Sequence, residues 1–67
     1  MIAVSGGANA TISRSIVKNS FTHGIVVSGS TSILTVSNST IYNNTDAGIG
    51  ITSLGQANIQ GSTFTGN

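Results

Sequence analysis

The segment ATISRSIVKN, residues 10–19, recurs as LTVSNSTIYN, residues 34–43, and again as ANIQGSTFTG, residues 57–66. The first shift is 24 residues and the second is 23. Apolar positions match in all three copies, and Ser15, Ser39 and Ser62 are identical. Self-similarity at a period of 20–50 residues is the sequence signature of solenoids and related arrays. The chain is therefore expected to be a stack of similar units.

A second block repeats in phase with the first. GIVVS, residues 24–28, matches GIGIT, residues 48–52, and IAVS, residues 2–5, is the same block one unit earlier. Ile12 precedes Ile25 by the same 13 positions that separate Val36 from Ile49. The one-residue difference between the two shifts is therefore predicted to lie in the turn between Gly29 and Leu34.

Apolar residues alternate within each block, which indicates short strands with one face turned inward. Helices would need apolar spacings of three and four residues, which these blocks lack. Stacking such strands places equivalent side chains above one another in structural ladders. The predicted apolar ladders are Ile2, Ile25 and Ile49; Ile12, Val36 and Ile59; and Val17, Ile41 and Phe64.

Strands that recur every 23 or 24 residues, with connections too short for helices, pair in parallel by coiling. Crossovers between parallel strands are right-handed in about 98% of cases. The pattern resembles the right-handed parallel β-helix repeat family, the pectate-lyase-like β-solenoids. We therefore predict an all-β chain of about three coils, with three short strands per coil. The expected division of the single segment is a partial coil 1–9, coils 10–33 and 34–56, and a partial coil 57–67.

Polar residues also recur at fixed positions. Ser15, Ser39 and Ser62 are expected to bond turn backbone through their hydroxyls. Asn19 and Asn43 are expected in the left-handed conformation after the third strand, with Gly66 there in the last copy. Their amides could form a ladder, which could also be shifted by one place, because Asn44 aligns with Asn67. Gly24 and Gly48 are predicted to meet a demand for positive φ.

Composition excludes several classes of function. Charged residues make up 4% of the chain, with a net charge of +1, so no basic surface for nucleic acid is expected. The chain has no cysteine, which rules out disulfides and cysteine-ligated metals. No apolar run approaches the roughly 18 residues of a membrane span, and no signal peptide is recognisable. We expect no cofactor and no metal site.

The resemblance raises the question of catalysis, because many parallel β-helices are polysaccharide lyases or hydrolases. Glycoside hydrolysis commonly needs two carboxylates, and calcium binding needs several. The chain has one acidic residue, Asp46. His23 aligns one position away from Asp46 on the neighbouring coil, so the two could approach each other, but no nucleophile or third ligand accompanies them. The sequence therefore predicts no enzyme in these residues.

Two outward surfaces are candidates for contact with a ligand. Lys18 and Tyr42 share a column that could hold a cation–π pair or a stacked sugar. Thr11 and Ser13, with Thr35 and Ser37 on the next coil, form a grid of hydroxyls that faintly resembles ice-binding β-solenoids. The third coil departs from the grid with Asn58 and Gln60.

The coil ends carry apolar residues and no helical cap, Pro or charged gatekeeper, so they are expected to be uncapped. Three hypotheses follow. The first is a structural or self-associating β-solenoid segment of a secreted or surface protein, its ends meeting other copies or continuing a longer β-helix. The second is a fragment of a carbohydrate-binding or carbohydrate-processing β-helix whose carboxylates lie elsewhere. The third is an ice- or surface-binding face.

Overall fold

The computed structural model describes all of residues 1–67 and consists of three parallel sheets joined by turns. Every coil contributes one strand to each sheet. The first sheet contains β1 (Ile2–Val4), β4 (Ile25–Ser28) and β7 (Ile49–Thr52). The second contains β2 (Asn9–Ser13), β5 (Ile33–Ser37) and β8 (Gln56–Gln60), and the third contains β3 (Ile16–Lys18), β6 (Thr40–Tyr42) and β9 (Thr63–Thr65).

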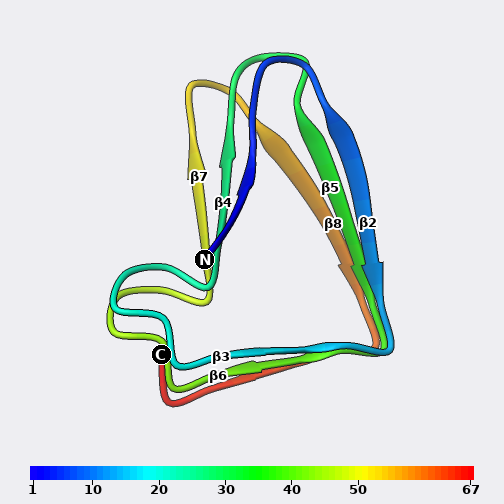
Figure 1. Ribbon diagram of the computed structural model, residues 1–67. Helices are drawn as coiled ribbons and strands as arrows, with labels where there is room; N and C mark the ends of the chain where they lie inside the picture. The colour runs from blue at the N-terminus through cyan, green and yellow to red at the C-terminus, as the bar shows by residue number, and fades with distance from the viewer.

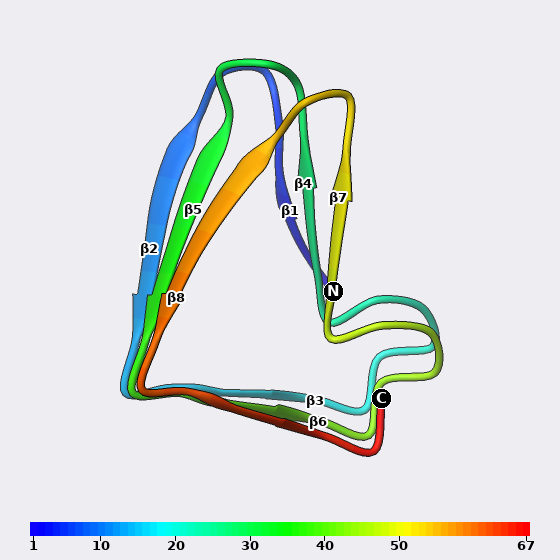
Figure 2. The same cartoon turned by 180° about the vertical axis from the view of Figure 1, so that it is seen from behind.

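Viewed along the coil axis, the three sheets form the sides of an irregular triangle (Figure 1). The connection from the third sheet back to the first bulges outward, and the reverse view shows the same stacking order (Figure 2). The principal extents are 28 × 23 × 13 Å. The shortest extent agrees with three coils stacked at about 4.8 Å per strand. The architecture is that of a right-handed parallel β-helix, as the repeat predicted.

Strand register confirms the repeat position by position. Ile12 pairs with Val36 and Val36 with Ile59. The extra residue of the middle coil lies between Ser28 and Ile33, inside the turn that the sequence indicated. Ser32 in this turn is fully buried, and its hydroxyl accepts a hydrogen bond from the Gly7 N–H at 3.0 Å. The turn is thereby tied to the coil before it.

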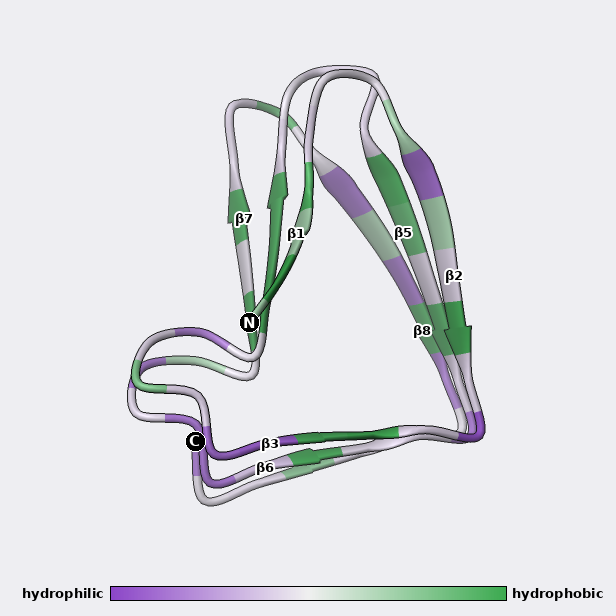
Figure 3. Cartoon of the chain, viewed as in Figure 1, coloured by the Kyte–Doolittle hydropathy of each residue, from purple (hydrophilic) through white to green (hydrophobic).

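The buried core belongs mainly to the middle coil. Its members come from β1, β4, β5 and β6, whose apolar segments are coloured green in Figure 3. Apolar burial contributes about 25 cal/mol per Å², so a coil covered on both sides gains the most. The fully or nearly fully buried apolar residues are Val4, Ile25, Val27, Leu34, Val36 and Ile41, and only Val4 comes from an outer coil.

All three corners of the triangle contain left-handed residues, and at two of them a single residue per coil has this conformation. The corner after the third strand has Asn19 at φ 61°, Asn43 at 55° and Gly66 at 61°, which confirms the predicted conformation. The corner between the second and third sheets was not predicted. It uses one left-handed residue per coil, at φ of 48°, 49° and 55°, namely Arg14, Asn38 and Gly61.

The prediction for Gly24 and Gly48 was wrong. Neither residue has a positive φ, so backbone conformation does not demand glycine there. Space does. A Cβ on Gly24 would lie 2.8 Å from the Asn44 Nδ2 and from the Gly48 carbonyl oxygen, and a Cβ on Gly48 would lie 2.7 Å from the Phe64 ring. Both glycines are buried where an asparagine amide or an aromatic ring crosses the interior.

Candidate functional site

The recurring serines form a hydrogen-bonded ladder along the stack. The Ser15 N–H donates to the Ser39 Oγ, and the Ser39 N–H donates to the Ser62 Oγ, each at 3.2 Å. Each hydroxyl in turn donates to the carbonyl two residues earlier in its own coil, at 2.8–3.0 Å. The Ser39 and Ser62 hydroxyls thus accept from the N–H groups of Ser15 and Ser39, which have no backbone acceptor at this corner.

The asparagine ladder is shifted by one residue from Asn19 and Asn43, which are exposed. Asn44 is 2% exposed, and its Nδ2 donates to the Asn67 Oδ1 at 2.8 Å. Its Oδ1 accepts from the Ser20 N–H at 3.1 Å. The aligned pair Asn44 and Asn67 was the sequence signal for this arrangement. The ladder holds the outward bulge of each coil to the next coil.

His23 and Asp46 do not form a pair. The Nδ1 of His23 accepts a hydrogen bond from the Ala47 N–H at 3.2 Å. The ring also lies against Gly50, where an added Cβ would come within 3.1 Å of the imidazole Cδ2. Asp46 is exposed. The imidazole therefore links its own coil to the backbone of the next coil. These contacts explain its position without a catalytic role.

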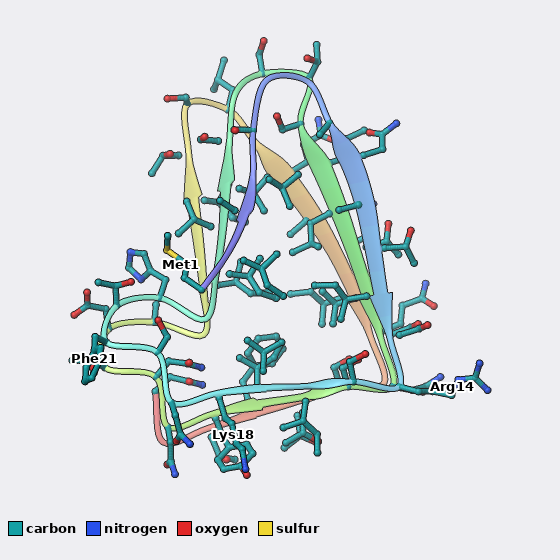
Figure 4. All side chains as sticks on the ribbon, viewed as in Figure 1. Met1, Arg14, Lys18 and Phe21 are labelled. Atoms are coloured by element: carbon teal, nitrogen blue, oxygen red, sulfur yellow. The ribbon has the colours of Figure 1, made fainter.

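The six candidate surface residues lie on two different sides of the triangle. The outer face of the second sheet carries four of them, with Thr11 paired with Thr35 and Ser13 paired with Ser37. Lys18 and Tyr42 lie on the third sheet, where the Lys18 Nζ is 5.7 Å from the Tyr42 ring centroid. Figure 4 shows Lys18 directed away from the interior, and Arg14 projecting from the corner between the two sheets. The six residues do not form one continuous surface.

The sequence predicted uncapped coil ends, but it did not predict the hollow on the surface of the third coil. A hollow of about 590 Å³ opens there, with four apolar residues among the nine that line it. The inward residues of the third coil are incompletely covered, because no further coil packs on them. Ile51 is 49% exposed and Ile59 is 45% exposed, and Phe64 is half-buried. Asp46 lies at the rim of the hollow. We name this surface the C-terminal face.

The first coil presents a comparable surface on the opposite end of the stack. Ile2 is 40% exposed although its partners in the same ladder, Ile25 and Ile49, are buried and half-buried. Ile12 and Val17 are half-buried, in contrast to the fully buried Val36 and Ile41 beneath them. We name this surface the N-terminal face. Both faces expose core residues together with one free edge of each sheet.

Comparison with protein families identifies the architecture independently. A family model described as "Right handed beta helix region" matches residues 1–67. The chain belongs to the right-handed β-helix family. No curated protein and no solved structure matches this β-helix.

The β-helix brings together no recognisable metal-binding set. No group of three or more His, Cys, Asp or Glu side chains is placed to hold an ion. The chain also contains no helix of the length and apolarity needed to cross a bilayer.

Proposed function

We propose that these residues act as a structural, self-associating β-solenoid segment of a secreted or surface protein, without catalysis of their own. The observation that supports this proposal most strongly is the contrast between the covered middle coil and the incompletely covered outer coils. Apolar side chains that are buried in the middle coil are 40–49% exposed at Ile2, Ile51 and Ile59. Unpaired strand edges next to exposed apolar surface are the usual templates for pairing with further strands.

The polar groups support a structural role. The recurring serines and the buried asparagine bond backbone in neighbouring coils, and His23 does the same. One carboxylate, Asp46, is fewer than acid–base hydrolysis or calcium-assisted elimination needs. Location outside the cell is part of the proposal, and it rests on the hydroxyl-rich outer surface of the second sheet.

Sedimentation velocity over a hundredfold range of concentration tests this function. We expect the mean mass to rise with concentration and the assemblies to elongate along the coil axis. A compact species of 6.7 kDa at every concentration would contradict self-association. That result would favour coverage of the faces by further coils of the same polypeptide.

The carbohydrate and ice-binding alternatives have less support. The single tyrosine, Tyr42, already carries the Lys18 ammonium near its ring, and a stacked sugar would compete with it. On the second sheet, the hydroxyls of Thr35 and Ser37 give way to Asn58 and Gln60 in the third coil. Titration with uronic-acid oligosaccharides and a thermal hysteresis assay, respectively, would detect these activities.

A further inference from the structure

The strands of the first coil and those of the third coil are separated by the same numbers of residues. The strands of the middle coil are not. Ile2 pairs with Ile25 and Ile25 with Ile49, so equivalent positions of the first and third coils are 47 residues apart. The second and third sheets give the same separation. The connection between the first and second sheets is one residue longer only in the middle coil. The N-terminal face therefore matches the C-terminal face strand for strand.

From this match we propose that the partner of the C-terminal face is the N-terminal face of a second copy, stacked head to tail in continuous register. Residue i of the second copy lies over residue i + 47 of the first. The inference rests on the proposed function and adds to it the partner, the direction and the register. In the third sheet, Thr63, Phe64 and Thr65 would pair with Ile16, Val17 and Lys18 of the next copy.

The serine ladder has the correct polarity to continue across this junction. In the chain, each serine N–H donates to the hydroxyl of the serine in the following coil. The Ser62 N–H is the donor left at the C-terminal face, and the Ser15 hydroxyl, which donates to the Ser13 carbonyl, is the acceptor left at the N-terminal face. Head-to-tail stacking joins the two. Stacking of two C-terminal faces would instead bring donor against donor.

Side-chain volume is also compatible. Val17 of the second copy would lie over the bulkier Phe64, and Ile12 over Ile59, which keeps these two interior columns apolar. Met1 departs from its column, where the other two coils have glycine. It is 68% exposed and its Sδ contacts the Thr22 Oγ1, so its side chain lies off the apolar interior.

Charge does not oppose the stack. Arg14 and Lys18 both belong to the first coil, and the charged side chain at the C-terminal face, Asp46, is acidic. Consecutive copies would place each cation about 14 Å from its equivalent, three strand spacings along the axis. That separation exceeds the Debye length of about 8 Å at physiological ionic strength, so repulsion between like charges is largely screened.

Cysteine pairs test the register directly. Ile16 and Thr63 both point outward from the third sheet, and within one chain they are separated by two coils, roughly 10 Å. This distance is too long for a disulfide, which needs Cα atoms closer than about 7 Å. Across the proposed junction they are direct neighbours at about 4.8 Å. The double variant Ile16→Cys/Thr63→Cys should therefore give a ladder of multimers under mild oxidation, and either single variant should give at most dimers.

An offset pair is the matched control. Ile16→Cys with Thr65→Cys places the thiols two residues out of register, about 8 Å between Cα atoms. We expect about tenfold less multimer from this pair than from the in-register pair. Equal yields from the two pairs would overturn the register. Assembly seen by sedimentation without any cross-link between positions 16 and 63 would also overturn it, while the proposed self-association would stand.

Variants with one face blocked by a charged side chain test the direction of stacking. Ile2→Lys places a charge on the N-terminal face and Ile51→Lys on the C-terminal face, and Phe21→Lys changes a side chain that is 91% exposed on the outward bulge and belongs to neither face (Figure 4). Each blocked variant alone should remain a monomer with a β-type circular dichroism spectrum. An equimolar mixture should form dimers only, and the Phe21 variant should assemble as the unmodified chain does. A blocked variant that dimerises with itself would refute head-to-tail stacking.

Discussion

The asparagine ladder offers the sharpest test of how this β-solenoid is held together. Asn44→Ala removes a side chain that is 2% exposed. The Ser20 N–H then loses its acceptor, and the Asn67 Oδ1 loses its bond from the Asn44 amide. A buried polar group left without a partner costs about 1–3 kcal/mol. We therefore expect the free energy of unfolding to fall by about 2–3 kcal/mol. A 67-residue domain has about 3–10 kcal/mol in total.

Urea unfolding followed by far-ultraviolet circular dichroism measures this loss, at a protein concentration below the onset of assembly. Asn43→Gly is the matched control, because Asn43 is the adjacent asparagine, is exposed and has a φ of 55° that glycine adopts freely. The control should stay within about 0.5 kcal/mol of the unmodified chain, as surface substitutions usually do. A loss for Asn43→Gly equal to that for Asn44→Ala would refute the assignment of the ladder to position 44.

Further predictions concern single positions. Gly24→Ala should destabilise the fold by about 1–3 kcal/mol, as overpacking does, because its Cβ would meet backbone at 2.8 Å. Gly6→Ala, at φ 66° with nothing within 4 Å of the added Cβ, should cost about 1 kcal/mol through backbone strain alone. Urea unfolding of the two variants measures both losses of stability. Ser39→Ala should cost about 1–3 kcal/mol in the same assay, because one backbone N–H loses its acceptor. His23 should carry its neutral-ring proton on Nε2, visible in long-range ¹H–¹⁵N spectra; a proton on Nδ1 would contradict its bond to the backbone.

Much of this fold follows from local and periodic features of the chain. Alternation of apolar residues defines each strand, and the period of 23 or 24 residues fixes which strands lie together, because parallel strands of one short coil can pair only with the next coil. The one-residue insertion was located from spacing alone, and the left-handed corner at Asn19 and Asn43 from the tolerance of asparagine for that conformation.

Other features depend on contacts between coils that no single repeat contains. Gly24 and Gly48 need to be glycine because an amide and an aromatic ring some 16–20 positions later in the chain fold back over them, and nothing local indicates that crowding. The choice between Asn43 and Asn44 for the buried ladder depends on which side chain turns inward at the bulge. Arg14 adopts positive φ because its column does so in every coil, although arginine has no local preference for it.

The sequence by itself determined the coil, its register and the one long turn, because these arise from periodic spacing along the chain. The sequence also predicted uncapped coil ends, but only the tertiary structure gave the extent of exposure, 40–49% at Ile2, Ile51 and Ile59, and showed that the serine ladder ends in a free donor at Ser62. Exposure and hydrogen-bond direction depend on what lies above and below each coil. They are properties of the stack as a whole, and the order of residues within one repeat does not specify them.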